Sequence, residues 1–196
     1  MTNFEDRIAD WLSVEQAMKK ILDRVTTLDV ESVQINSVLG RTLARDICAP
    51  STLPPLANSA MDGYAVRSSD LGVASKTDPS VFNVAGVVHA GSFFEDTVGK
   101  NEAVRIMTGG AVPKGTDTVV RVEDTDRERT EPGKISIFSI RDRGRNVRPS
   151  GEDWIEGTTV LKLGQSISPR QIAVLAAARV NSVPVFKKPT VAVLSS

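Results

Sequence analysis

The feature that most constrains the fold is a middle region of short β-rich runs, from about residue 51 to residue 156. Turn-forming pairs such as Asp62-Gly63, Gly109-Gly110 and Pro132-Gly133 separate these runs. The candidate strands are Val81–Val88, Ala103–Met107, Thr118–Val122 and Ile135–Ile140. Short strands between frequent turns predict a compact all-β domain over residues 51–156.

Helix and strand patterns precede this region. Apolar residues recur every three or four positions from Val14 to Val25, which predicts a helix. Ser13-Val14-Glu15-Gln16 fits a capping box at its start. Val33 and Ile35 alternate as a short strand, and Ser37 is expected to cap a brief helix through Val38 and Leu39. Prolines at positions 50, 54 and 55 mark the boundary that follows.

Mixed structure returns after the middle region. Thr158–Leu163 and Val183–Phe186 read as strands, and Ser168-Pro169 predicts the start of a helix over Arg170–Arg179. The apolar run Val191–Leu194 is typical of a strand buried on both faces of a parallel sheet. Because no partner strand follows it, we expect the chain to stop at the first strand of a further α/β domain.

These patterns together predict a mixed α+β fold. A discontinuous helix-and-strand domain comprises residues 1–50 and 157–188, and an all-β domain over residues 51–156 is inserted in it. Residues 189–196 are then the first strand of a truncated α/β domain.

Composition excludes several classes of protein. The 196 residues carry 24 lysines and arginines against 24 aspartates and glutamates, which gives no whole-chain case for nucleic-acid binding. The 40% hydrophobic content argues against disorder, and no apolar stretch is long enough to span a membrane. A lone Cys48 and a lone His89 leave no internal disulfide or Cys/His zinc site. A polar N-terminus and these counts predict a cytoplasmic protein.

Charge is unevenly distributed along the chain. Residues 123–131 hold five acids and two arginines, whereas residues 141–148 hold four arginines and one aspartate. Residues 158–196 hold five basic residues and no acid. This distribution suits anionic ligands better than the zero total suggests.

Three segments carry residues suited to chemistry. In Asn58–Ala65, Asp62 is suited to accepting hydrogen bonds or to binding a hard cation, although Asp-Gly is equally a turn signal in a loop. In Arg105–Gly115, the backbone amides of the Thr108-Gly109-Gly110 turn are suited to binding an oxyanion, and the alternative is a plain glycine-rich connection. The segment lacks the Gly-Lys-Ser/Thr ending of a P-loop.

The third segment is Arg145–Asp153. Its Arg148 has the planar fork that binds phosphate, and Glu152 and Asp153 are suited to binding a cation or orienting a water. The alternative is a solvated charged loop, which is the commoner explanation of a bare charge run.

Taken in this order, the three segments resemble the signature segments of the molybdopterin molybdenumtransferase family, the bacterial molybdenum-insertion enzymes related to the E domain of gephyrin. Gly40–Ala44 and Val183–Val185 are also similar to that family. The resemblance implies a transferase of molybdenum cofactor biosynthesis that inserts molybdate into adenylylated molybdopterin and releases AMP. It also implies assistance by a divalent cation, usually Mg²⁺, and a homodimer whose second subunit completes the cleft.

The resemblance assigns roles residue by residue. Asp62, Thr108 and Asp153 match the family's catalytic positions, and Ser59, Gly109 and Arg148 match positions that contact substrate or oxyanion. Asp62 and Asp153 are the candidate metal ligands, with the main ligand region expected beyond Ser196. Molybdopterin-adenylating protein and molybdoenzymes are implied partners, whereas nucleic acid and membrane are not.

The resemblance also qualifies the fold. It implies that the helix-and-strand domain is elongated, that its first helix packs on the domain that follows, and that Val191–Ser196 begins a molybdopterin-binding α/β domain. Ser196 stands where the family has Thr. The family's next segment, Ser-Thr-Gly-Asp-Glu-Leu, is cut after two residues, so its acidic residue and the loops that the family uses to hold pterin and molybdate are missing. For that reason we expect the chain by itself to bind molybdopterin weakly and to have no insertion activity. The alternatives are a non-catalytic dimerisation or scaffold module of the gephyrin type, and an unrelated oxyanion-binding β domain.

Overall fold

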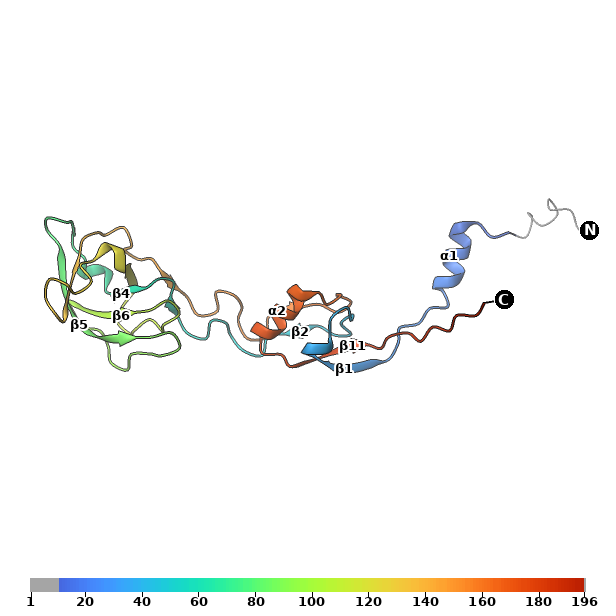
Figure 1. The fold of residues 1–196 in the computed structure, drawn as a ribbon. Coiled ribbons are helices and arrows are strands. Elements are labelled where there is room, and N and C mark those ends of the chain that lie inside the picture. Colours follow the sequence, from blue (N-terminus) through green and yellow to red (C-terminus); the bar gives the residue numbers. More distant parts are fainter. Residues whose placement is uncertain (1–10, 196) are drawn as a thin grey trace, which may run out of the picture. The chain divides into compact units, whose positions relative to one another are not determined.

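The computed structural model describes residues 11–195 as a mixed α+β chain with few helices (Figure 1). It divides into two compact units. The first runs up to Ile47 and resumes at Val160, and the second is Cys48–Thr159. In the described part of the chain, neither helix is both long and apolar enough to cross a membrane.

The first helix, α1, spans Val14–Leu22 and begins where the sequence predicts. The Ser13 amide donates to Gln16 Oε1 at 3.0 Å, and the Gln16 amide donates to Ser13 Oγ at 3.2 Å. This reciprocal pair confirms the capping box. Its apolar side chains are exposed, among them Val14, Met18 and Ile21.

The first unit has its core between a strand pair and the second helix. Strand β1 (Val30–Gln34) pairs antiparallel with β11 (Ser182–Phe186), and β2 (Ile47–Cys48) pairs with β10 (Thr159–Leu161). Helix α2 (Pro169–Ala177) starts at Ser168 in a second capping box. The buried residues of this core are Val38, Leu43, Ile47, Leu161, Ile167, Leu175, Val183 and Val185.

One prediction in this unit is wrong, and another stays a prediction. Ser37 does not cap a helix through Leu39; it ends a short 3₁₀ helix, η2 (Ile35–Ser37), and its hydroxyl donates to Asn36 Oδ1 at 3.2 Å, whereas an N-cap hydroxyl accepts from an amide further along the chain. The strand predicted over Val191–Leu194, as the start of a further domain, stays a prediction, because the described chain forms no strand there. No strand among the described residues pairs with it, and its side chains are exposed, Leu194 by 94%.

The second unit is built on a curled five-stranded sheet of order β7-β4-β6-β5-β8. The strands are β7 (Thr118–Arg121), β4 (Gly63–Val66), β6 (Glu102–Ile106), β5 (Ser80–Val88) and β8 (Lys134–Ile137). All neighbours are antiparallel except β5 and β6. Short 3₁₀ helices η3 (Ser68–Asp70) and η4 (Val122–Asp124) and the pair β3 (Asn58–Ser59) and β9 (Val147–Arg148) complete the unit.

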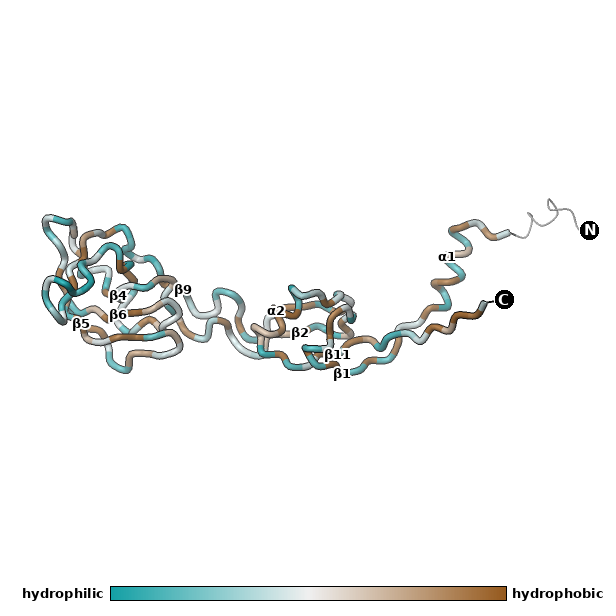
Figure 2. The backbone as a smooth tube through the Cα atoms, in the orientation of Figure 1, coloured by the Kyte–Doolittle hydropathy of each residue, from teal (hydrophilic) through white to brown (hydrophobic). Residues whose placement is uncertain are grey.

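The prediction that Asn58–Ala65 is a loop is wrong in part. Its last residues form the start of β4, which lies between β6 and β7 near the middle of the sheet. All four residues of β4 are buried, so the alternation that marks a half-buried strand is missing. Hydrophobic residues, brown in Figure 2, are interspersed with hydrophilic ones along the strands of this unit, and each face of the sheet carries its own core. One core contains Tyr64, Phe82, Val120, Ile135 and Ile137, and the other contains Ala65, Val88, Val104, Ile106 and Val119.

Candidate functional site

The short strand β3 is where the three segments singled out in the sequence meet. Asn58 and Ser59 pair antiparallel with Arg148 and Val147. On the Gly-rich side, the Ser59 amide donates to the Gly110 carbonyl at 2.9 Å, and the Gly109 amide donates to the Ser59 carbonyl at 2.8 Å. Backbone hydrogen bonds therefore bring the three segments, distant in sequence, into one site.

Asp62 and Thr108 form a direct link across this site. The Thr108 amide donates to Asp62 Oδ1 at 2.7 Å, and the Thr108 hydroxyl donates to the same oxygen at 2.8 Å. The pKa of the Asp62 carboxyl lies below its ordinary value, chiefly because of the hydrogen bond from the Thr108 amide. The hydrogen bond from the Thr108 hydroxyl and the charge of Arg105 lower it further. Among residues 11–195, no donor binds the other oxygen, Oδ2. Asp62 therefore presents one ionised, exposed oxygen on a side chain whose position is fixed.

Gly63 fixes where Asp62 sits. A Cβ atom at position 63 would lie 2.0 Å from the carbonyl oxygen of Val120 on β7, so only glycine allows the two strands to approach this closely. The Asp62 carbonyl accepts from the Val122 amide at 3.0 Å. Gly63 thus allows β4 and β7 to pack closely, and this packing fixes the position of Asp62, the residue directly before β4.

Ser59 is placed inside the turn that leads to Asp62. It is 1% exposed, and its hydroxyl donates to the Met61 carbonyl at 2.6 Å and lies 3.2 Å from the Met61 amide, which donates to it. These bonds shape the turn between β3 and Asp62. Its predicted contact with substrate stays a prediction.

The backbone amides of Gly109 and Gly110 in the Gly-rich turn already donate hydrogen bonds within the protein. Gly109 adopts a φ of 81°, and a Cβ atom on Gly110 would lie 3.0 Å from atoms of Ile106, Met107 and Val88. The Gly110 amide donates to the Met107 carbonyl at 2.8 Å, while the Gly109 amide is bound to Ser59. An oxyanion contact from the Gly109 amide, as predicted, would therefore require the turn to open.

Arg148 is paired with its own segment. Its Nε donates to Glu152, and its Nη2 lies 3.3 Å from each carboxylate oxygen of Asp153. The guanidinium charge is thus compensated by two partly exposed carboxylates. Nowhere in the described chain do three or more His, Cys, Asp or Glu side chains gather in a way that would hold a metal ion.

A buried ion pair supports the third segment, and the sequence did not reveal it. Asp142, 1% exposed, accepts from the Arg121 amide at 3.1 Å and from its Nε and Nη2 at 2.9 and 2.8 Å. Asn146 then donates from Nδ2 to the Val119 carbonyl at 2.8 Å, and the Asn146 carbonyl accepts from Ala60. The only sequence signal was one aspartate in an arginine-rich run.

A cleft of about 240 Å³ opens beside Asp62. Its lining residues are Asp62, Gly63, Arg105, Met107, Val122 and Arg127. Arg127 lies outside the three segments and was not singled out by the sequence. A mostly apolar cavity of about 290 Å³, lined by Pro55, Leu56, Asn58, Gly91, Ser92, Phe93, Gly109 and Ala111, adjoins the Gly-rich turn.

Known proteins match this chain along most of its length. The family model described as MoeA N-terminal region (domain I and II) matches residues 12–178. The molybdopterin molybdenumtransferase of Staphylococcus aureus (strain MRSA252) is 38% identical over 189 residues, which cover 94% of this chain and 43% of that protein. The enzyme of the same name from Staphylococcus epidermidis (strain RP62A) is 37% identical over 188 residues, with the same coverage of both chains.

Solved structures agree. A molybdopterin biosynthesis MoeA protein from Pyrococcus horikoshii superposes with a TM-score of 0.77 at 35% identity, covering 91% of this chain and 45% of that one. A second MoeA structure, from strain OT3 of that organism, gives a TM-score of 0.79 at 33% identity, with coverages of 87% and 45%. The chain spans less than half the length of these relatives. It belongs to the MoeA N-terminal region family.

Proposed function

We propose that this chain forms part of the site at which molybdate is inserted into adenylylated molybdopterin during molybdenum cofactor biosynthesis, as in a molybdopterin molybdenumtransferase. The observation that carries this proposal is the ionised Asp62 carboxylate, which Thr108 holds at the junction of the three segments. Family membership and relatives of that name support the same activity.

The chemistry of the reaction suits this arrangement. Adenylylated molybdopterin carries a phosphoanhydride and molybdate is an oxyanion, so release of AMP requires neutralisation of charge and a positioned attacking oxygen. The lowered pKa of Asp62 makes it a weak proton acceptor at neutral pH but keeps it fully charged. We therefore assign Asp62 to orienting a water or binding a cation through Oδ2, and Thr108 to positioning Asp62.

The donor set fits a Mg²⁺ ion that is shared with a substrate phosphate. Mg²⁺ is commonly bound by one or two carboxylates together with phosphates and waters, and Asp62 Oδ2 is the carboxylate oxygen that this site offers. Asp153 fits less well, because both of its oxygens face the Arg148 guanidinium. A bound Mg²⁺ would neutralise charge that develops on the leaving phosphate.

The finer architecture belongs to the same proposal. We assign the first unit to an elongated discontinuous domain, the second unit to an inserted all-β domain, and residues 189–196 to the first strand of an α/β domain that binds molybdopterin. The exposed apolar face of α1 and the exposed Val191–Leu194 run support further packing partners. The homodimer, the molybdopterin-adenylating protein and molybdoenzymes as partners, and the cytoplasmic location stay predictions.

A chimera tests the proposal directly. This chain replaces the matching N-terminal part of the Staphylococcus aureus relative, and AMP release and molybdenum incorporation are measured with adenylylated molybdopterin, molybdate and Mg²⁺. We expect turnover, a loss of about a hundredfold or more for Asp62→Asn, and little change for Asp78→Asn, which alters an exposed aspartate outside the cleft. Near-normal turnover by Asp62→Asn would overturn the proposal. A folded, inactive chimera that still self-associates would favour a scaffold module.

A further inference from the structure

We propose that the cleft beside Asp62 is an oxyanion subsite in which Arg105 and Arg127 bind a tetrahedral dianion. The inference deepens the proposed function and rests on it, because it names the part of the site that takes a phosphate or molybdate group. The two arginines come from segments 22 positions apart in the chain, and both line one cleft of about 240 Å³.

Arg105 reaches the cleft because of its position on β6. It is directly opposite Tyr64 on β4, so the two side chains leave the same face of the sheet. It is the one exposed residue of β6 and stands near the end of the strand, followed two positions later by Met107, which also lines the cleft. A charged side chain at the rim of an otherwise apolar face has no packing role that explains it.

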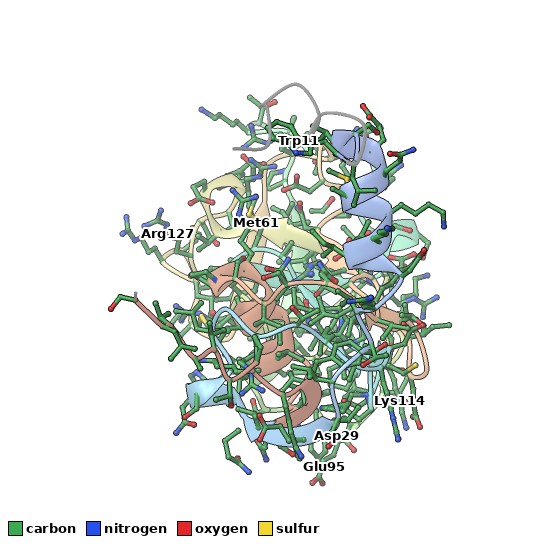
Figure 3. All side chains as sticks on the ribbon, turned by 90° about the vertical axis from the view of Figure 1, so that its right-hand side faces the viewer. Trp11, Asp29, Met61, Glu95, Lys114 and Arg127 are labelled. Carbon is green, nitrogen blue, oxygen red and sulfur yellow. The ribbon has the colours of Figure 1, made fainter. Side chains whose placement is uncertain are left out.

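Arg127 reaches the same cleft from a turn that is tightly held. Arg127 and Glu128 have φ values of 57° and 60°, an unusual pair of adjacent left-handed residues without glycine. The Asp126 carboxylate accepts from the Glu128 and Ser136 amides, and Glu128 accepts from the Tyr64 hydroxyl at 2.8 Å. The turn thus fixes the backbone, while the Arg127 side chain extends outward from it (Figure 3).

The positive charge of the cleft is only partly compensated. Arg121, Arg141 and Arg148 each bind a carboxylate. Within the described chain, by contrast, neither Arg105 nor Arg127 forms an ion pair. Two guanidinium groups and one carboxylate, that of Asp62, line the cleft, so its lining carries a net positive charge. The nearby carboxylates of Asp126 and Glu128 accept hydrogen bonds from the turn and from Tyr64 and do not line the cleft.

A tetrahedral oxyanion is the ligand that this arrangement fits. Guanidinium groups bind phosphate-like oxygens through paired N–H donors, and two of them, one from strand β6 and one from a turn, neutralise a dianion. The cleft has room for about eight water molecules at about 30 Å³ each, which accommodates such an ion with part of its hydration shell. Both a phosphoester and molybdate present this chemistry.

Titration of the full chain with three probes tests the inference. Sodium molybdate, inorganic phosphate and AMP are added separately at low salt, and amide chemical shifts and binding heats are recorded. We expect saturable shifts at Gly63, Arg105 and Arg127. Arg105→Gln and Arg127→Gln should each weaken binding by about tenfold or more, and Arg127→Lys by less than Arg127→Gln. Arg129→Gln is the matched control, since it removes an exposed arginine two positions away that does not line the cleft.

The probes also distinguish the source of the anion. Binding of phosphate and AMP without molybdate assigns the cleft to the phosphoester, and binding of molybdate alone assigns it to the metal oxyanion; either result supports the subsite. Binding of no probe, or equal affinity in the wild type and in both Arg→Gln variants, overturns it. Because this titration involves no turnover, its failure leaves the Asp62 test of the proposed function intact.

Discussion

The substitution Asp142→Ala tests whether a buried ion pair holds the third segment of the site in place. Asp142 receives three hydrogen bonds from Arg121, one of them from the backbone amide. The loop that follows carries Asn146, which binds β7 through its side chain and Ala60 through its carbonyl. Loss of the carboxylate should therefore loosen both β7 and the entry to β9.

The size of the effect follows from the geometry. Removal of one partner of a buried pair costs about 3–5 kcal/mol, and an orphaned backbone amide alone costs about 1–3 kcal/mol. The Arg121 side chain is 30% exposed, so water compensates part of the loss. We expect the free energy of unfolding of the second unit to fall by about 3 kcal/mol. With a urea dependence of about 1.5 kcal/mol per molar, the unfolding midpoint falls by about 2 M.

The assay is urea unfolding at neutral and at acid pH. Burial alone would raise the pKa of Asp142, but the hydrogen bonds from Arg121 outweigh it and hold the pKa below its ordinary value. A lowered folded pKa gives stability that is fully present above the unfolded pKa and is lost as the pH falls through the folded pKa. The gap between wild type and variant should therefore be full at pH 7 and shrink in acid. A gap below about 0.5 kcal/mol at pH 7, the size seen for exposed sites, would refute the reasoning.

Three further predictions concern the residues around Asp62. Thr108→Val removes one of the two donors to Asp62, so the pKa of that carboxyl should rise toward its ordinary value, as followed by carboxyl-carbon NMR; an unchanged pKa would count against the link. Gly63→Ala places a methyl group against the neighbouring strand and should destabilise the second unit by about 1–3 kcal/mol or more in a thermal melt; an unchanged melting temperature would contradict this. Tyr64 is the single tyrosine, so its absorbance titration is unambiguous. Burial and the hydrogen bond to Glu128 raise its pKa to about 12, and Glu128→Gln should lower it; ionisation near pH 10 in the folded wild type would be inconsistent with the structure.

Local signals in the sequence predicted where both α-helices start. The start of α1 was predicted from a capping box at Ser13, and the start of α2 from an N-cap serine, Ser168, followed by Pro169, because a helix start is decided by residues a few positions apart. Four of the five strands of the large sheet, β5, β6, β7 and β8, were predicted from their β-rich composition. β4 was missed because a strand buried on both faces shows no alternation of apolar and polar residues. The strand predicted over Val191–Leu194 requires a partner strand, and none of the described strands pairs with it.

The site was predictable only in part, for a physical reason. The three segments were singled out, yet the hydrogen bonds between Asp62 and Thr108 join residues 46 positions apart, which no local pattern specifies. Arg148 forms an ion pair with Glu152, only four residues along the chain. Its charge is therefore compensated within its own segment, whereas the sequence suggested an arginine available to bind phosphate. Arg127 enters the cleft through a turn geometry that composition does not reveal.

The central claim is that Asp62 and Thr108 act as one unit at the junction of the three segments. A double-mutant cycle on AMP release by the chimera tests this, with Asp62→Asn, Thr108→Val and the double variant. If Thr108 acts by positioning Asp62, its substitution matters only when the carboxylate is present, so the double variant should be no slower than Asp62→Asn alone. If instead the double variant is slower by the full product of the two single losses, Asp62 and Thr108 act independently, which would contradict the claim that they act as one unit.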